Sequence, residues 1–187
     1  MEGRMNRNTG RLIGAAGVAA LGVVAGLALS RSRRAAMKAV MALTGDWEKQ
    51  LKAEHTAMKK LLKAMTDTET GEDVKRAELL ETFDELITRH SLEEEKVIYP
   101  ALKAAGAGAA SELLFGDHGE MKTMLRALQE LRSEAPDWTE GAKALRRLVL
   151  RHVRQEEELF PLLHQLGDKD RNKALTTLVR REAVRVS

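Results

Sequence analysis

The stretches HSLEEEKVIYP (residues 90–100) and HVRQEEELFP (residues 152–161) repeat one pattern, and the predicted fold rests on it. Each stretch begins with a histidine, has a glutamate four positions later, and ends with an aromatic residue followed by proline. The whole chain has only five histidines, one tyrosine and three phenylalanines. Because residues i and i+4 share one face of an α-helix, each stretch predicts a helix that directs a histidine and a glutamate toward one point.

The sequence around these stretches has the apolar spacing of amphipathic helices. Three predicted helices cover residues 36–65, 74–103 and 111–132, and a fourth begins at Asp137, where Asp137 and Glu140 predict a capping box. Short polar or glycine-rich turns separate them, which places neighbouring helices antiparallel. Aromatic residues are 3% of the chain and there are three prolines, which also favours helices over a sheet. The predicted fold is therefore all-α, an up-down four-helix bundle.

Four histidines fall on the apolar stripes of these helices, three or four residues from Leu, Ile, Val or Met. His55 precedes His90 by 35 residues, and His118 precedes His152 by 34 residues. The domain is therefore interpreted as one helical hairpin used twice. Each hairpin supplies a histidine from its first helix and His-x-x-x-Glu from its second. His164 and Tyr99 are assigned ordinary packing roles, because they lie about 120° and 180° away from the stripe histidines of their helices.

Two carboxylates in an apolar core cost several kcal/mol unless they are paired. Imidazole and carboxylate together suit iron, manganese or zinc, and six ligands are too many for one closed tetrahedral zinc site. The chain has no cysteine, which excludes a thiolate site. Taken singly, a stripe histidine is more often a hydrogen-bonded core residue, but the repeat favours two metals with two histidines each and two bridging glutamates. The predicted ligands are His55, His90, Glu94, His118, His152 and Glu156, with Glu157 as the alternative bridge.

At these residues the chain resembles the hemerythrin family, in particular its hemerythrin-like (HHE) cation-binding domains. The resemblance covers about residues 45–165 and rests on four stretches, AEHTAMKKLLKAM (53–65), HSLEEEKVIYPAL (90–102), FGDHGEMKTML (115–125) and HVRQEEELFPLL (152–163). It implies a four-helix bundle that encloses two non-heme iron ions, joined by oxo or hydroxo and carboxylate bridges. Oxygen-carrying members have a further histidine where this chain has Lys122, so a simple carrier role is not implied.

The resemblance implies a protein that binds or senses dioxygen, nitric oxide or peroxide at the di-iron centre. Two alternatives stay open: a peroxide-decomposing enzyme, and a membrane-tethered structural or iron-handling module. Ferritin-like di-iron bundles use Glu-x-x-His instead, and no histidine here has a glutamate three positions before it. No nucleic-acid partner is expected, because the positive charge is concentrated in residues 1–38 and the remainder of the chain is acidic, with 24 basic and 27 acidic residues.

Residues 12–30, LIGAAGVAALGVVAGLALS, carry no charge and are long enough to cross a bilayer as a helix. A cleaved signal peptide is the alternative, but Arg31, Arg33 and Arg34 follow at once and oppose translocation. The glycines of this segment form small-xxx-small pairs that permit a homodimer. The predicted organisation is a single-pass membrane protein with segment 1–35, a hemerythrin-like bundle at 36–165 in the cytoplasm, and a short basic C-terminal helix at 166–187. That helix either packs on the bundle or lies on an anionic membrane.

Overall fold

The structure, a computed structural model, describes residues 45–131 and 135–185. The chain divides into two units, Met1–Val40 and Met41–Ser187, and every described residue belongs to the second unit. The predicted membrane segment at residues 12–30 therefore lies outside the described residues. Within the described ranges, no helix is both long enough and apolar enough to cross a bilayer.

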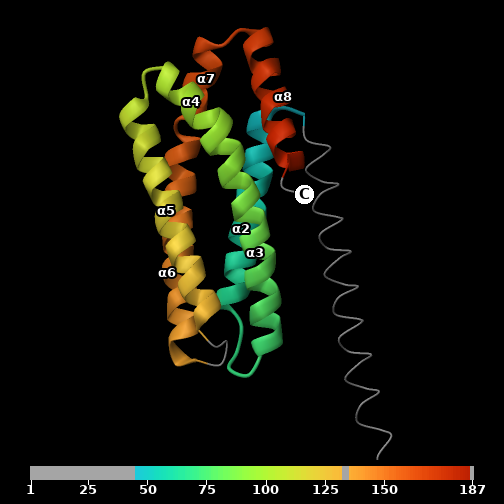
Figure 1. The fold of residues 1–187 in the computed structure, drawn as a ribbon, viewed down its shortest axis with the longest axis vertical. Coiled ribbons are helices and arrows are strands. Elements are labelled where there is room, and N and C mark those ends of the chain that lie inside the picture. Colours follow the sequence, from blue (N-terminus) through green and yellow to red (C-terminus); the bar gives the residue numbers. More distant parts are fainter. Residues whose placement is uncertain (1–44, 132–134, 186–187) are drawn as a thin grey trace, which may run out of the picture. The chain divides into compact units, whose positions relative to one another are not determined.

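Four long helices form the body of this unit: α2 (Trp47–Thr66), α3 (Asp73–Glu93), α5 (Gly108–Glu130) and α6 (Pro136–Glu157). They run side by side and alternate in direction (Figure 1). Helix α2 packs against α3 and α6, and α5 packs against α6. Every regular element in the described part of the chain is helical. The predicted all-α up-down bundle is confirmed.

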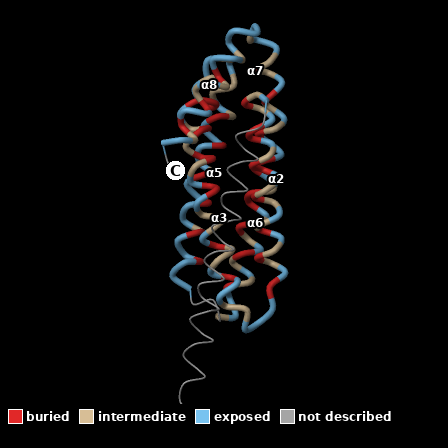
Figure 2. The backbone as a smooth tube through the Cα atoms, turned by 90° about the vertical axis from the view of Figure 1, so that its right-hand side faces the viewer, coloured by how far each residue is buried: buried red, intermediate tan, exposed pale blue. Residues whose placement is uncertain are grey.

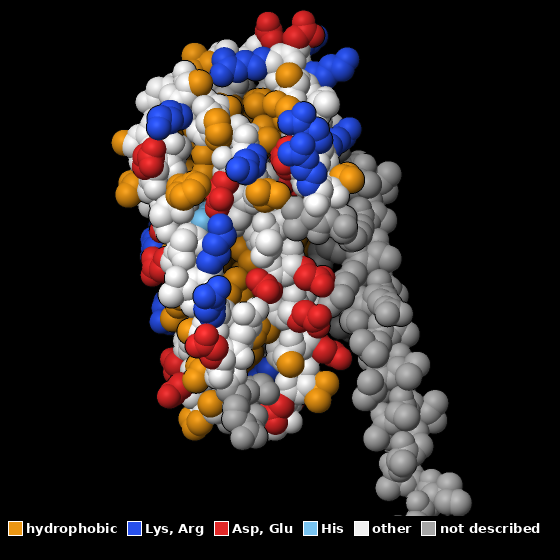
Figure 3. All heavy atoms as spheres, viewed as in Figure 1, with side chains coloured by type: hydrophobic (Ala, Val, Ile, Leu, Met, Phe, Trp, Pro, Cys, Tyr) orange, Lys and Arg blue, Asp and Glu red, His pale blue; other side chains and the backbone are white. Residues whose placement is uncertain are grey.

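Shorter elements extend the bundle at one end. The π-helical turn η1 (Glu94–Ile98) and α4 (Tyr99–Ala104) continue α3, while α7 (Phe160–Leu166) follows α6. The predicted C-terminal helix is α8 (Lys169–Arg185), which packs against α2, α3 and η1. Its buried residues include Leu175 and Val179, and lysine and arginine side chains gather over its outer face (Figure 3). Two roles are predicted for this helix, packing on the bundle or lying on an anionic membrane. The structure shows α8 packed on the bundle.

The helix ends follow ordinary local rules, with one correction. Asp46 accepts a hydrogen bond from the backbone N–H of Lys49 at 2.9 Å and caps α2. Gly71 precedes α3 with φ of 92°, a backbone conformation that side-chain-bearing residues rarely adopt. The predicted capping box at Asp137 is wrong: α6 already begins at Pro136, and no side chain caps it. Proline at the first helical position is pre-organised for the helix, so the helix begins one residue earlier than the capping pattern implied.

The helix that carries His90 widens at η1, which begins one turn after the core-facing His90. The N–H of Tyr99 donates to the carbonyl of Glu94, five residues back, as in a π-helix. Pro100 follows and has no N–H to give to an α-helical partner. A π turn holds one extra residue, which shifts everything after it by roughly 100° relative to a straight α-helix. This shift decides where Tyr99 points.

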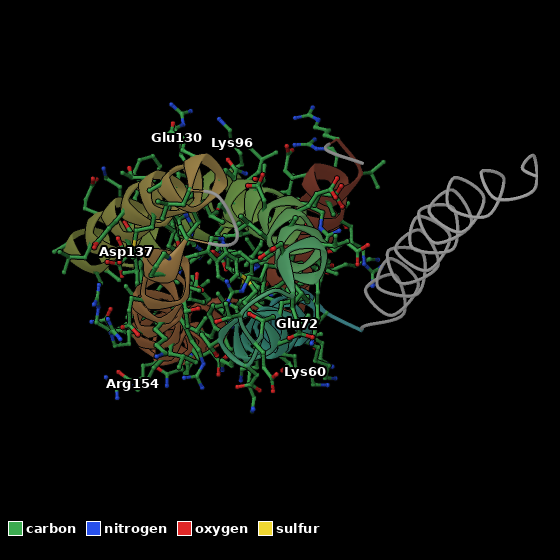
Figure 4. All side chains as sticks on the ribbon, turned by 90° about the horizontal axis from the view of Figure 1, so that it is seen from below. Lys60, Glu72, Lys96, Glu130, Asp137 and Arg154 are labelled. Carbon is green, nitrogen blue, oxygen red and sulfur yellow. The ribbon has the colours of Figure 1, made fainter. Side chains whose placement is uncertain are left out.

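Burial follows the faces that meet inside the bundle. Buried residues lie along the inner sides of the helices, and exposed residues lie along the outside (Figure 2). Viewed along the bundle, charged residues such as Lys60, Lys96 and Arg154 project outward (Figure 4). The largest fully buried side chains are Trp47 and Trp138, and both lie near the first turns of their helices. The interior between them is where the predicted ligands lie.

Candidate metal centre

The bundle core brings all six predicted ligand residues together. His55 comes from α2, His90 from α3, His118 from α5 and His152 from α6, with exposed fractions of 0–1%. Glu94, the first residue of η1, and Glu156, near the end of α6, are both fully buried. Each residue lies at the core-facing position that its helical spacing predicted. Metal ligation itself is a proposal that rests on this convergence.

The six side chains form two groups that share Glu94. One group is His55, His90, Glu94 and Glu156, and the other is Glu94, His118 and His152. Within each group, one possible ligand atom per residue lies within 4.8 Å of all the others. The rings pair accordingly: the centroids of His55 and His90 are 4.8 Å apart, and so are those of His118 and His152. Each helical hairpin therefore supplies one histidine pair.

The carboxylate of Glu94 lies between the two histidine pairs. Its Oε1 is 2.8 Å from Nε2 of His90 and 3.7 Å from Nε2 of His55. Its Oε2 is 3.2 Å from Nε2 of His118 in the other hairpin. One oxygen thus faces each pair, which is the arrangement that a bridging carboxylate requires.

Glu156 takes a similar position on the opposite helix. Its Oε2 lies 3.1 Å from Nε2 of His55 and 3.8 Å from Nε2 of His152, so it also lies between the pairs. Glu157, the alternative bridge, points elsewhere: its Oε1 is 2.8 Å from Nδ1 of His55, on the far side of that ring. The geometry therefore favours Glu156 over Glu157 as the second bridge.

Burial and neighbouring charges shift the pKa values of several residues in this cluster. Burial raises the pKa of Glu156 to about 7, and the nearby negative charge of Glu94 adds to this shift. Burial disfavours the charged form of His55, but hydrogen bonds to the surrounding glutamates outweigh it and raise the pKa of His55 to about 10. Burial lowers the pKa of His152 to about 4. Metal ligation requires neutral imidazoles and ionised carboxylates, so metal binding near neutral pH would release protons from His55 and Glu156.

Unpartnered polar atoms at the centre provide a test of whether a metal fits. Among the described residues, the buried side-chain atoms without a hydrogen-bond partner include both carboxylate oxygens of Glu156 and both ring nitrogens of His152. Oε1 of Glu94 also has none, because its 2.8 Å approach to Nε2 of His90 lacks the alignment of a hydrogen bond. Buried polar atoms are ordinarily satisfied, and leaving one unsatisfied costs about 1–3 kcal/mol. These atoms have the chemistry of a nitrogen- and oxygen-rich site for a divalent transition metal. The residues present therefore fit a metal centre.

Tyr99 also reaches the centre, and the packing role predicted for it is incomplete. It is buried, and its hydroxyl lies 3.0 Å from Nε2 of His118 and 3.3 Å from Oε2 of Glu94. Burial raises its pKa well above the usual value, and the glutamates nearby add to the shift, so the hydroxyl stays protonated. The prediction failed because it assumed 100° per residue throughout, whereas the π turn rotates Tyr99 back into the core. The Tyr-Pro pair does not by itself signal the π turn, because the Phe-Pro pair of the second copy occurs without one.

The second copy brings its aromatic residue inward without a π turn. It reaches Phe-Pro one residue sooner, and Phe160 is fully buried with its ring centroid 6.2 Å from that of His55. Tyr99 lies correspondingly close to His118, at 5.3 Å between centroids. One half of the centre therefore has a phenol hydroxyl and the other half has a plain phenyl ring.

Two other residues considered in the sequence, His164 and Lys122, lie outside the centre. His164 lies away from the centre: it pairs with Glu48 and stacks on Trp47, with ring centroids 5.1 Å apart. Lys122 points outward and pairs with Glu95 at 2.9 Å. Glu54 is not among the predicted site residues, but its buried carboxylate belongs to the site, because its Oε2 lies 2.8 Å from Nδ1 of His90. Its position directly before His55 was the available signal.

Comparison with known proteins places these features in a family. The profile of the Hemerythrin HHE cation binding domain matches residues 48–163. A hemerythrin HHE cation binding domain-containing protein of Mycobacterium kansasii has the same fold, with a TM-score of 0.64 and 19% identity, covering 76% of this chain and 86% of that one. A Nostoc sp. protein named DNA nickase is 31% identical over 71 residues, which are 38% of this chain but only 20% of that protein. The chain, with its two histidine pairs and the shared Glu94 inside a helical bundle, belongs to the hemerythrin HHE cation-binding domain family.

Proposed function

We propose that this protein is a non-heme di-iron protein that binds or senses dioxygen, nitric oxide or peroxide inside the bundle. The observation that supports it most is the position of Glu94, whose two oxygens face separate histidine pairs. His55, His90, His118, His152, Glu94 and Glu156 would hold two metal ions. Six side chains do not fill two coordination spheres of the kind iron adopts, so positions remain for a small ligand.

The protein side of this function is to position the ligands and to exclude water. Leu51, Met58, Leu114, Met121 and Val149 flank the histidines along the helices and are buried. Such an apolar shell admits small uncharged molecules and keeps bulk water and larger polar molecules away. When bound, the iron pair would supply reversible binding or one-electron chemistry at an oxygen or nitrogen atom.

A direct test measures metal content and optical spectra of the chain purified from iron-supplemented cells. We expect about two irons per chain and charge-transfer bands that change on addition of dioxygen or nitric oxide to the reduced protein. His118→Ala, which removes one ligand from one group only, serves as the matched comparison. The chain could instead hold iron while its optical spectrum does not change on addition of dioxygen, nitric oxide or peroxide. That result would contradict this function and favour a structural or iron-handling role.

Peroxide decomposition is a second candidate, because Tyr99 places a protonated hydroxyl beside His118 and Glu94. Disproportionation converts two molecules of hydrogen peroxide into two waters and one dioxygen, and it requires protons to move between oxygen atoms at the site. A buried phenol that keeps its proton is suited to donate a hydrogen bond or a proton to an oxygen held there.

Replacing Tyr99 with phenylalanine tests this role of the hydroxyl. The change removes one oxygen from a buried, well-packed ring, so the fold and metal content should be retained. We expect oxygen release from peroxide to fall by roughly 10²–10⁴-fold if the hydroxyl is a general acid. Phe160→Tyr is the matched control, since it adds a hydroxyl on the other half of the centre. Equal rates in Tyr99→Phe and unmodified protein, at equal iron content, would leave Tyr99 with packing alone.

We propose in addition that residues 12–30 anchor the protein as a single-pass membrane protein, with the bundle in the cytoplasm. The uncharged stretch flanked by Arg11 and Arg31 supports this, and its glycine face would permit a homodimer. Fractionation of cells that express the full chain tests the anchor. We expect it in membranes that resist alkaline washing, with the bundle accessible to protease only after lysis. Recovery in the soluble fraction would contradict the proposal.

A further inference from the structure

Each of the four centre histidines has a second carboxylate on the side of its ring that faces away from the centre. Nδ1 of His55 lies 2.8 Å from Oε1 of Glu157, and Nδ1 of His90 lies 2.8 Å from Oε2 of Glu54. In the other hairpin, Nδ1 of His118 lies 3.1 Å from Oε1 of Glu95.

The fourth contact is the loosest. Nδ1 of His152 lies 3.4 Å from Oδ2 of Asp117 without the alignment of a hydrogen bond. With this contact included, the second carboxylates are Glu54, Glu95, Asp117 and Glu157, which we call the outer carboxylates.

The outer carboxylates connect the four long helices in a closed circuit. Glu54 on α2 contacts the histidine of α3, and Glu95, which follows α3, contacts the histidine of α5. Asp117 on α5 faces the histidine of α6, and Glu157 on α6 contacts the histidine of α2. Each outer carboxylate faces a histidine of a neighbouring helix and not the histidine of its own helix. Each therefore fixes the ring orientation of a neighbouring helix relative to its own.

Each outer carboxylate also contacts a basic side chain from the helix whose histidine it faces. The closest nitrogen–oxygen distances are 3.5 Å for Arg89 and Glu54, 2.9 Å for Lys122 and Glu95, 3.3 Å for Arg151 and Asp117, and 3.8 Å for Lys59 and Glu157. These contacts place four basic side chains beside the four outer carboxylates around the centre.

The outer carboxylates and the basic residues that pair with them occur in a sequence pattern that repeats in the two hairpins. In α2 and α5, an acidic residue precedes the histidine and a lysine follows it by four positions, as EHTAMK (54–59) and DHGEMK (117–122). In the other two helices, an arginine precedes the histidine and two glutamates follow at the fourth and fifth positions, as RHSLEEE (89–95) and RHVRQEE (151–157). The first of the two glutamates faces the centre, and the second contacts a neighbouring histidine. The duplicated hairpin thus carries the outer carboxylates as well as the ligands.

We infer that Glu54, Glu95, Asp117 and Glu157 are positioning residues that hold Nδ1 of the four histidines and direct Nε2 toward the metals. A carboxylate that accepts the Nδ1–H bond fixes the tautomer and ring orientation and makes Nε2 a stronger ligand. This inference concerns the same site as the proposed function, but it needs only metal binding. It also gives Lys122 a role, as the cation that pairs with the outer carboxylate Glu95 at 2.9 Å.

The test measures Zn²⁺ affinity of the full chain by competition with a chelator. We expect Glu54→Gln and Glu157→Gln to weaken binding by about 10- to 100-fold. Asp117→Asn should have a smaller effect, because its contact is the longest of the four. Glu120→Gln is the matched control: it is exposed on α5 two residues beyond His118 and removes the same charge. Glu157, at 31% exposed, is the variant least at risk of misfolding.

A second readout separates positioning from general stability. In the metal-free chain, ¹H–¹⁵N spectra of the imidazoles should show Nδ1–H resonances for His55 and His90, and Glu157→Gln should shift the first of them selectively. Zn²⁺ affinity equal to that of Glu120→Gln in Glu54→Gln, Glu157→Gln and Asp117→Asn, with unshifted imidazole resonances, would overturn the inference. A chain that binds Zn²⁺ in this pattern, but whose iron form ignores dioxygen and nitric oxide, would refute the proposed function alone.

Discussion

Glu94→Ala should remove metal from both positions of the centre, whereas His152→Ala should affect only one. Glu94 is the residue common to the two ligand groups, and its two oxygens face different histidine pairs. Its loss would take a ligand from each metal, because its oxygens lie 2.8 Å from Nε2 of His90 and 3.2 Å from Nε2 of His118. We expect affinity to fall by more than the roughly 10- to 100-fold typical of a change outside the ligand set.

Metal analysis of the purified variants, side by side, provides the measurement. Glu94→Ala should hold little or no metal, and His152→Ala should retain about half of the unmodified amount, since only one of two groups contains His152. Glu120→Gln controls for loss of an acidic residue. Full metal content in Glu94→Ala would show that Glu94 does not bridge, and Glu156 would then have to hold both metals.

Removing the bound metals should lower the free energy of unfolding of the bundle more than replacing any single ligand residue does. Among the described residues, buried atoms of Glu94, Glu156 and His152 have no hydrogen-bond partner, and a bound metal would satisfy them only in the folded state. A ligand present at about 1,000 times its dissociation constant stabilises by roughly 4 kcal/mol. For a domain of this size that corresponds to about 10 °C or more in Tm.

Thermal unfolding of the same preparation with and without bound metal tests this expectation. Metal should be removed with a chelator at mildly acidic pH, where the ligands take up protons, and then restored. The expected result is a Tm that falls on removal and recovers on addition. Equal Tm values in both states would mean that the core tolerates its buried charges without metal, and that the centre contributes nothing to folding. His152→Ala should show a smaller difference than the unmodified chain.

The core-facing positions of the six predicted ligand residues follow from the sequence, because helical periodicity places each of them on an apolar stripe. His90 and Glu94 are one turn apart, as are His152 and Glu156, and each lies on an apolar stripe. The hairpin repeat then fixes which helices meet. Local spacing of this kind survives tertiary packing, because a regular α-helix keeps the same rotation per residue wherever it lies.

Tertiary structure decided the features that depend on departures from regular helix or on neighbours across the bundle. Tyr99 reaches the centre only because a π turn absorbs one residue before Pro100. The choice of Glu156 over Glu157 depends on which neighbouring ring each one meets, at His55 Nε2 or Nδ1. The outer carboxylates are adjacent to ligands in sequence, but their histidines lie on other helices. Helical periodicity in the sequence therefore predicts which residues face the core, whereas the atoms that meet there depend on how the helices pack.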